Sequence, residues 1–293
     1  MPKEPPILVV NKPRKSRTSP TGKKKSTPRK KKGKKQTSHE LPRWIYYLLG
    51  IIIVAIFSFG FYYFFIRPYA YRWKPCNGYK EYGVCMPYGY DIHGIDISHY
   101  QGNINWQQLS QSQANFHPIQ FVFLKATEGG DLADDTFTQN FDSARAHGFI
   151  RGAYHFFNPH TDALKQADFF IKTVKLDSGD LPPVLDIERI GRKSKTELVR
   201  SLKVWLNRIE SHYGVKPILY ASHKFKTKYL DDSLFNAYPY WIAHYYVDSV
   251  EYKGKWHFWQ HTDVGLVEGI PEEVDLNVFN GTLEELKKLT IKK

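Results

Sequence analysis

The 293-residue sequence predicts an α/β protein, a closed and irregular β/α barrel preceded by one transmembrane helix. Three observations support this prediction. Residues 44–66 contain no charged side chain, short apolar runs alternate with helical periodicity from about residue 93, and the last apolar runs leave no room for full helices between them. Strand–helix alternation favours a parallel sheet, and five βα units followed by three strands make the eight strands that close a barrel. An open, doubly wound sheet is the alternative, but no glycine-rich phosphate loop follows any of the runs.

The basic charge of the chain is confined to its first segment. The formal net charge is +13, and residues 1–43 contain fifteen Lys or Arg and two acids, so this segment accounts for the whole excess. Because it is poor in large apolar residues, it is predicted to be a disordered, basic cytoplasmic tail. The charge-balanced remainder gives no reason to expect a nucleic-acid partner. A contact of the tail with nucleic acid or anionic lipid stays an alternative to a role in membrane orientation.

Residues 44–66 are predicted to form a membrane-spanning helix. Twenty-three residues without a charge suffice to cross a hydrocarbon core of about 30 Å, and aromatic residues such as Trp44 and Tyr63 flank the run as in interfacial belts. A cleaved signal peptide is the competing interpretation, but its apolar region is shorter and ends in small residues. By the positive-inside rule the tail stays cytoplasmic. We therefore expect a single-pass membrane protein whose folded domain is extracytoplasmic, either periplasmic or at the cell surface.

The two cysteines, Cys76 and Cys85, lie in a Tyr-, Gly- and Pro-rich connector that covers residues 67–91. An oxidising compartment would favour a disulfide that closes this short loop, at about 2–3 kcal/mol. No neighbouring acid or histidine has the spacing of a metal site. The two cysteines are therefore predicted to have a structural role.

The folded domain is predicted to contain eight strands and several helices. The predicted strands are residues 94–98, 121–127, 151–157, 182–188, 217–222, 240–245, 256–262 and 274–279. The clearest helix covers residues 194–213, where apolar side chains recur on one face. Ser194 and Glu197 fit a capping box, and Gly214 stands where a helix is expected to end. Residues 136–147 show the same periodicity.

Polar residues stand at the carboxyl ends of many of these strands. The active site of a β/α barrel lies at that end, and an unpaired buried charge is costly. Several acids at one barrel mouth are therefore better explained by a functional site than by packing. The residues at these ends are Asp96, Glu128, His155, Asp186, Glu188, His244, Gln260 and Asp275.

The tripeptide Asp186-Ile187-Glu188 is the strongest single element. Residues i and i+2 of a strand point to the same face, with their α-carbons about 6.5 Å apart, which matches the carboxyl separations of glycosidases at about 5–9 Å. Each carboxylate raises the proton affinity of the other, so one can remain protonated near neutral pH and act as a general acid. The same tripeptide is common at solvated strand ends and among metal ligands, so it does not decide the function alone.

Aromatic and amide side chains near the strand ends are candidate substrate contacts. Aromatic faces bury apolar surface and leave their edges to polar partners, which suits sugar rings. We expect Tyr154, Trp241, Tyr245 and Gln260 to bind substrate, and most other Phe and Trp residues to be core. The histidines lack the i, i+4 pair of a zinc helix, so no catalytic metal is expected.

An ordered set of segments links the domain to a known family. The segments are HGIDISHYQGNINW, FLKATEG, FTQNFDSARAHGFIRGAYHF, VLDIE, ILYAS, YWIAHY, FWQHT and VDLNVFNG. Together they resemble glycoside hydrolase family 25, the Chalaropsis-type lysozymes or N-acetylmuramidases. The resemblance covers residues 92–288 and none of the tail or the apolar helix. The segment WQHT departs from the more usual WQYT, so His261 replaces a common aromatic residue.

The resemblance implies a TIM-like (β/α)5(β)3 barrel that hydrolyses the β-1,4 bond from N-acetylmuramic acid to N-acetylglucosamine. Its partners would be the glycan strands of peptidoglycan and, through the apolar helix, membrane lipid; no cofactor is implied. By position, Glu188 resembles the family's general acid and Asp186 the carboxylate beside it. Asp96 and Asp275 match the remaining acidic positions and are expected to hold the orientation and charge state of the pair.

Two retaining mechanisms stay open at this point. Glu188 would protonate the glycosidic oxygen and then activate water in both. Asp186 would either attack the anomeric carbon or orient the acetamide of the substrate as an internal nucleophile.

Two other classes of protein are alternatives. A chitinase-like retaining glycosidase would carry further acids ahead of the D-x-E pair, where this chain has Pro182 to Leu185. A non-catalytic peptidoglycan-binding membrane protein would not need all four acids.

Overall fold

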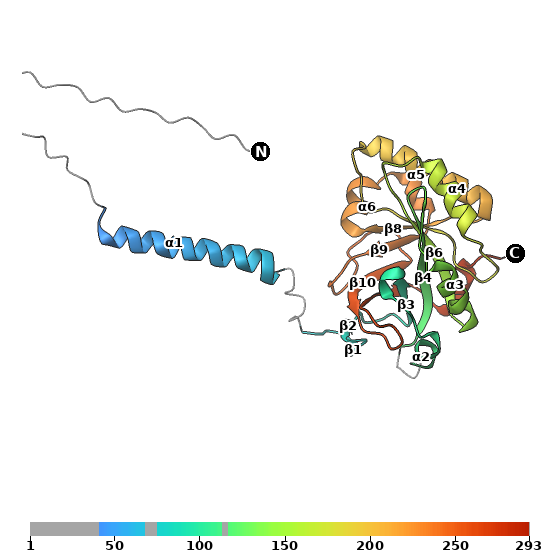
Figure 1. Cartoon of the computed structure of the whole chain (residues 1–293), viewed down its shortest axis with the longest axis horizontal. Coiled ribbons are helices and arrows are strands. Elements are labelled where there is room, and N and C mark those ends of the chain that lie inside the picture. The colour runs from blue at the N-terminus through green and yellow to red at the C-terminus, as the bar shows by residue number, and fades with distance from the viewer. Residues whose placement is uncertain (1–40, 68–74, 113–116, 293) are drawn as a thin grey trace, which may run out of the picture. The chain divides into compact units, whose positions relative to one another are not determined.

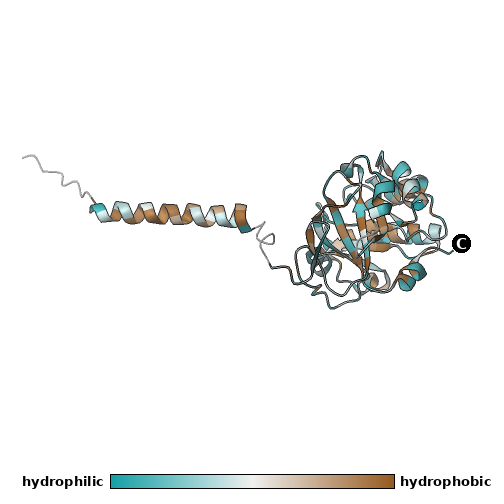
Figure 2. Cartoon of the chain, turned by 90° about the horizontal axis from the view of Figure 1, so that it is seen from below, coloured by the Kyte–Doolittle hydropathy of each residue, from teal (hydrophilic) through white to brown (hydrophobic). Residues whose placement is uncertain are grey.

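The computed structural model describes residues 41–67, 75–112 and 117–292, and the chain divides into two compact units, residues 1–67 and 68–293 (Figure 1). The predicted tail lies outside the described residues except at its last positions. In the first unit, helix α1 (Arg43–Phe61) continues into a π-helical turn, η1 (Tyr62–Ile66). This helix is long and apolar enough to cross a membrane, and the colouring of Figure 2 shows that most of its residues are hydrophobic. By length and composition it suits a membrane anchor or a signal sequence, and it coincides with the predicted span.

The second unit contains a closed ring of eight strands, as the sequence predicted. The ring runs in the order β3 (Ile92–Ile97), β11 (Val274–Phe279), β10 (Phe258–Gly265), β9 (Tyr240–Ala243), β8 (Ile218–Ser222), β7 (Val184–Asp186), β6 (Ile150–Phe156) and β4 (Ile119–Glu128). Pairing of β3 with β4 closes it. Strand β11 runs antiparallel to both of its neighbours, and the other ring pairs are parallel. A short strand, β5 (Leu132–Ala133), adds to β4 outside the ring.

Five βα units precede three final strands, so the expected (β/α)5(β)3 pattern is confirmed. The helical elements of the second unit are η3 (His99–Gln101), α2 (Trp106–Gln111), α3 (Phe137–Ala146), α4 (Ala163–Thr173), α5 (Lys195–Tyr213), α6 (His223–Tyr229), η5 (Ser233–Ala237) and α7 (Leu283–Leu289). Helices α3 to α6 lie around the outside of the strands (Figure 1). Helix α5 has the predicted capping box at Ser194 and Glu197, and it ends at Gly214 with a left-handed φ of 72°.

Strand β7 is shorter than the predicted strand over residues 182–188. Pro182 and Pro183 have no N–H to donate to a ladder, so regular pairing starts at Val184. Pairing ends at Asp186, and Ile187 continues with a single backbone bond to the carbonyl of Tyr220. Glu188 therefore stands just beyond the strand, at the mouth of the barrel.

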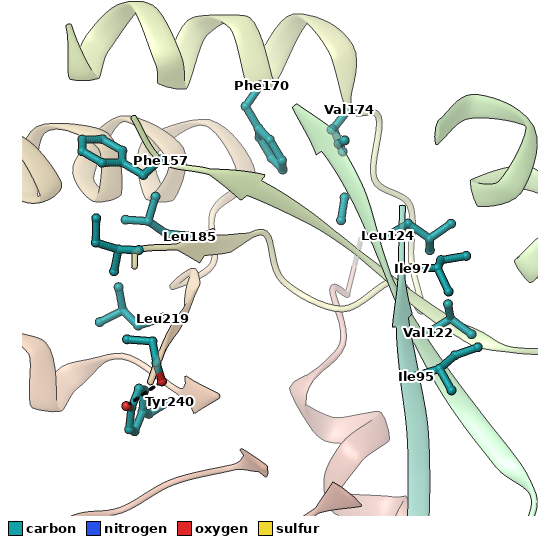
Figure 3. Packing of buried hydrophobic residues seen from close by; sticks show 14 of the residues in the cluster. Ile95, Ile97, Val122, Leu124, Phe157, Phe170, Val174, Leu185, Leu219 and Tyr240 are labelled. Atoms are coloured by element: carbon teal, nitrogen blue, oxygen red, sulfur yellow. Dashed lines mark hydrogen bonds between the residues drawn. The ribbon is translucent and has the colours of Figure 1, made fainter. Parts of the chain in front are cut away.

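Alternate residues of the strands pack into two separate cores. The interior of the ring is aromatic, with the rings of Phe123 and Trp241 stacked 4.4 Å apart between their centroids. A larger core lies between the strands and the helices, where Leu124, Leu185 and Leu219 meet residues such as Phe170 of α4 (Figure 3). Because successive side chains of a strand point to opposite faces, the same alternation decides which polar residues reach the barrel mouth.

The connector between the two predicted units contains a folded hairpin. Strands β1 (Tyr79–Glu81) and β2 (Val84–Met86) pair around a turn at Tyr82 and Gly83, which both have positive φ. The Cys76–Cys85 disulfide closes the hairpin. Its side chains dock on the barrel, where Glu81 accepts from Nδ1 of His117 at 3.0 Å. This part of residues 67–91 therefore belongs structurally to the second unit.

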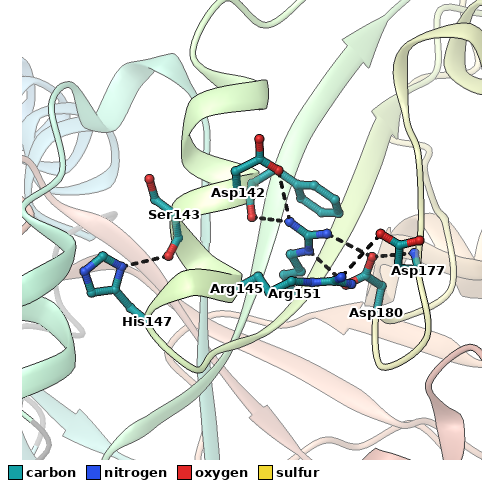
Figure 4. A network of polar contacts seen from close by, with 8 residues as sticks. Asp142, Ser143, Arg145, His147, Arg151, Asp177 and Asp180 are labelled. Atoms are coloured by element: carbon teal, nitrogen blue, oxygen red, sulfur yellow. Dashed lines mark hydrogen bonds and ion pairs between the residues drawn. The ribbon is translucent and has the colours of Figure 1, made fainter.

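A buried ion pair joins strand β6 to the loop after α4 (Figure 4). The Arg151 guanidinium donates to both carboxylate oxygens of Asp180, at 2.8 and 3.3 Å, and to the carbonyl of Phe141 at 2.6 Å. Arg145 and the backbone N–H of Asp177 also donate to Asp180. Arg151 and Asp180 are 4% and 1% exposed, so the pair is desolvated and its charges are matched inside the protein.

Candidate active site

A cavity of about 240 Å³ opens among residues at the carboxyl ends of the strands. It is lined by Asp96, Ile97, Ser98, Tyr100, Gln101, Lys125, Tyr154, Phe156, Asp186, Glu188, Tyr220, Trp241, Tyr245, Gln260 and Asp275. The four acids named from the sequence, and the four expected substrate contacts, are all in this lining. Their chemical roles remain predictions.

Several polar strand-end residues that were expected at the mouth are absent from this lining. His155 lies between the strands and the helices, where Nδ1 meets Thr127 Oγ1 at 2.7 Å and its ring stacks on Trp205. His244 is also absent, and its ring lies against that of His223. The sequence placed these residues at strand ends without showing which way each side chain points, and strand residues alternate between inside and outside.

Asp186 is a buried carboxyl group at the end of β7. Burial raises its pKa well above the usual range, and the nearby carboxyl groups of Glu188 and Asp96 raise it further, while Lys125 opposes them. Its Oδ1 atom is buried and accepts no hydrogen bond from any residue that the structure describes. A buried acceptor without a protein partner is unusual and is suited to a donor brought by a ligand.

Glu188 is the most accessible of the four acids. Its side chain reaches solvent, as a group that protonates an incoming substrate must do. Partial burial still raises its pKa, against the opposing charges of Arg189 and Lys125. A carboxyl group of this kind can hold its proton closer to neutral pH and release it to a bound oxygen atom.

Asp96 and Asp275 face each other across the antiparallel pair of β3 and β11. Burial raises the pKa of both groups, and each lies in the electrostatic field of nearby carboxyl groups. Oδ1 of Asp96 accepts hydrogen bonds from Gln260 Nε2 at 2.9 Å and Asn277 Nδ2 at 2.7 Å. Four carboxyl groups thus line the cavity, and Lys125 is the lysine that lines it with them.

Three residues of this region were not named from the sequence. Lys125 forms an ion pair with Glu128 at 2.6 Å, and Tyr220 donates to Gln260 Oε1 at 2.6 Å. Asn277 supports Asp96 from strand β11. Strand alternation could have indicated Asn277, because it stands two residues after Asp275 and shares its face. Lys125 and Tyr220 lacked such a signal, since each stands inside an apolar run.

A metal-ion site is not part of this arrangement in the described ranges. No group of three or more His, Cys, Asp or Glu side chains there could hold a metal ion.

The barrel and its carboxyl-lined mouth define a glycoside hydrolase. The sequence model of glycosyl hydrolases family 25 matches residues 95–270, and the chain belongs to this family. Asp275 lies outside the matched range, and the fold brings it beside Asp96.

Relatives and solved structures agree with this assignment. The Uncharacterized protein YegX of Escherichia coli strain CFT073 is 43% identical over 249 residues, which cover 82% of this chain and 90% of the relative. Lysozyme M1 of Streptomyces globisporus is 32% identical and is matched over 68% of this chain and 71% of its own length. Two solved structures align with a TM-score of 0.62. They are a lysozyme from Streptomyces coelicolor (32% identity, 68% of this chain and 96% of that chain) and a family 25 glycosyl hydrolase from Bacillus anthracis (33%, 69% and 94%).

Proposed function

We propose that this protein is a membrane-anchored lysozyme that hydrolyses the β-1,4 bond from N-acetylmuramic acid to N-acetylglucosamine in peptidoglycan. The observation that carries the proposal is the pair at the mouth of the barrel: an accessible Glu188 beside a buried Asp186 whose Oδ1 accepts from none of the described residues. Relatives named lysozyme and N,O-diacetylmuramidase supply the substrate class.

Glu188 is the general acid and base of the proposed reaction. It gives its proton to the glycosidic oxygen while the bond from that oxygen to the anomeric carbon breaks. In the second step the Glu188 carboxylate takes a proton from water, and the water oxygen attacks the anomeric carbon. Two successive displacements at that carbon retain its configuration.

Asp186 orients the acetamide of the substrate in this mechanism. Burial raises its pKa and so disfavours the ionised form that a nucleophile needs, and its Oδ1, which accepts from none of the described residues, could accept the acetamide N–H. The acetamide carbonyl oxygen then attacks the anomeric carbon and forms a cyclic oxazolinium ion, which water opens. The covalent alternative, in which Asp186 attacks the carbon, would require that carboxyl group to be ionised first.

The apolar helix α1 would place this chemistry outside the cytoplasm. With the fifteen basic residues of residues 1–43 held on the cytoplasmic side, the barrel faces the wall. Membrane lipid is then a partner of the helix, and the glycan strands are the substrate of the barrel. No cofactor takes part in the proposed chemistry.

Digestion of purified peptidoglycan by the detergent-solubilised chain tests this proposal. Mass spectrometry should find new reducing ends at N-acetylmuramic acid, and Glu188→Gln should lower their rate of formation by at least ~100-fold, as expected for a lost general acid. Glu268→Gln, an exposed glutamate that does not line the cavity, is the matched control and should keep full activity. Wall binding without any cleavage would instead identify a binding protein.

The role of Asp186 needs a separate measurement. A thiazoline analogue of the oxazolinium ion should inhibit the enzyme, and a fluorosugar substrate should leave no sugar attached to the protein. A trapped glycosyl ester on Asp186 would refute the acetamide-assisted route and support the covalent one.

A further inference from the structure

We propose that Asn277 and Gln260 are positioning residues that hold Asp96 as the anionic member of a carboxyl pair, so that its partner Asp275 keeps the proton. This rests on the proposed muramidase function and deepens it. On this proposal, two amide side chains that do not themselves react determine which carboxyl group of the pair is ionised.

The orientation of Asn277 is fixed by a donor that cannot act as an acceptor. The indole Nε1 of Trp241 donates to Oδ1 of Asn277 at 2.8 Å, and an indole N–H is only ever a donor. The oxygen of the Asn277 amide must therefore face Trp241. Its nitrogen faces Asp96, where Nδ2 donates to Oδ1 at 2.7 Å.

Two tyrosines fix Gln260 in a similar way. The hydroxyl groups of Tyr220 and Tyr245 donate to Oε1 of Gln260 at 2.6 and 2.7 Å, and Nε2 then donates to Asp96 at 2.9 Å. Gln260 is only 2% exposed, and these three bonds hold its amide inside the protein. These contacts support a positioning role for Gln260, and its predicted contact with substrate stays a prediction.

Both amides donate to the same oxygen atom of Asp96. Oδ1 is occupied by two N–H groups, so a proton on Asp96 could only be carried by Oδ2, and protonation would weaken both hydrogen bonds. Hydrogen bonds to the charged form of a carboxyl group favour that form. Asn277 and Gln260 therefore stabilise the Asp96 carboxylate in a place where burial alone would discharge it.

Asp275 lies opposite Asp96 in the register of β11 and β3. Directly opposed residues of antiparallel strands have β-carbons about 5 Å apart, and two carboxyl groups that share a site cannot easily both ionise. No hydrogen bond to the Asp275 carboxyl group comes from the described residues that support Asp96, so the proton of the pair is kept by Asp275. Asp263 of the neighbouring strand β10 also acts on Asp275 and favours its protonated form. The other titratable and charged groups that line the cavity are Asp186, Glu188, Lys125, Tyr100, Tyr154, Tyr220 and Tyr245.

An anionic Asp96 would act in the transition state. Positive charge develops at the anomeric carbon during glycoside cleavage, and a fixed negative charge in the cavity stabilises it more than the neutral ground state. Loss of that charge should therefore lower kcat and leave KM nearly unchanged. Activity should rise with pH as Asp96 ionises.

Two variants test the assignment on the full chain. Asn277→Asp and Gln260→Glu each keep the oxygen that accepts from Trp241 or the tyrosines, and each replace a donor to Asp96 by a second carboxyl group. We expect the acid limb of the kcat profile to move up by about one pH unit or more in either variant, a tenfold rise in proton affinity. KM should change less than about twofold.

Asn140→Asp is the matched control. Asn140 of α3 is buried and accepts from the indole of Trp106 at 3.2 Å, which repeats the Trp–Asn contact away from the cavity. The acid limb of its kcat profile should lie at the same pH as in the wild type. Equal loss of kcat at every pH in both test variants would reduce Asn277 and Gln260 to structural residues and overturn the proposal.

A second readout works without catalysis. The thermal stability of Asn277→Asp and Gln260→Glu, relative to wild type, should fall as pH rises from 5 to 9, because the buried Asp96 charge then lacks a donor and faces a second carboxyl group. Asn140→Asp also adds a buried carboxyl group, so its own fall with pH is the baseline that both test variants should exceed. A pH-independent difference in Tm for both test variants refutes the assignment. Absence of wall cleavage by the wild-type chain, with the trend in Tm intact, would refute the muramidase function alone.

Discussion

Removal of one partner of the buried Arg151–Asp180 ion pair should destabilise the barrel strongly. In Asp180→Ala the Arg151 guanidinium would stay buried at 4% exposure and would lose the carboxylate that accepts from its Nε and Nη2 atoms. Arg145 and the N–H of Asp177 would lose the same acceptor. The cost of a broken buried pair is about 3–5 kcal/mol.

The shift in melting temperature follows from the size of the second unit. For a domain of this size, each kcal/mol lowers Tm by about 2–4 °C, so Asp180→Ala should melt about 6–20 °C below the wild type. Differential scanning calorimetry of the detergent-solubilised chain measures this shift. Asp142→Ala is the matched control, because Asp142 is exposed and contacts Arg151 only at 3.4 Å. That control should melt within about 2 °C of the wild type.

A double variant distinguishes the contribution of the ion pair to stability from that of side-chain packing. Arg151→Met with Asp180→Leu removes both charges and leaves no unpaired ion, so it should be less destabilised than the sum of the two single variants. A loss below about 1 kcal/mol in Asp180→Ala would refute the reasoning. So would strict additivity in the double variant, since it would mean that the two side chains do not interact.

Two further predictions concern pH. Lys125→Met removes a cation that holds down the pKa of Glu188, so the alkaline limb of kcat/KM, where the general acid loses its proton, should move up by about 0.5–1 unit; an unmoved limb in peptidoglycan digestion would contradict this role. His93 is fully buried, and burial lowers its pKa to about 4, so below about pH 6.5 the unfolded chain takes up a proton that the folded chain resists. The free energy of unfolding should therefore fall by about 3 kcal/mol between pH 6.5 and 4 on account of this residue. Urea unfolding of His93→Gln should show a flatter acid dependence, and an unchanged slope would show that His93 is not the group that titrates.

The sequence alone predicted the features that depend on residues close together in the chain. The uncharged run of residues 44–66 predicted a helix of membrane-spanning length, because no other arrangement satisfies its backbone in lipid. The apolar runs predicted all eight ring strands, and Ser194, Glu197 and Gly214 marked the ends of α5, since caps depend on residues only a few positions apart. The D-x-E tripeptide likewise indicated two carboxyl groups that both line the cavity, although Glu188 stands just beyond the strand.

Other features depend on neighbours that are distant in the chain. Pairing of Asp96 with Asp275 brings together residues 179 positions apart, and only ring closure through β3 and β11 decides it. The side chain of His155 does not reach the barrel mouth, because successive strand residues face opposite sides of the sheet. A short apolar run does not show which of its residues face inward. Even the hairpin of residues 79–86 depends on contacts with His117 and Leu266.

The sequence by itself predicted the fold class and the apolar helix, because these depend on periodicity, length and residue type, and the family resemblance added the four acids as candidates. The tertiary structure alone decided which acids lie buried, which oxygen atoms accept hydrogen bonds, and which one accepts none from the described residues. The physical reason is that a pKa depends on burial and on charges within a few ångströms. The neighbours of Asp96, namely Gln260, Asn277 and Asp275, come from two strands more than 160 residues further along the chain.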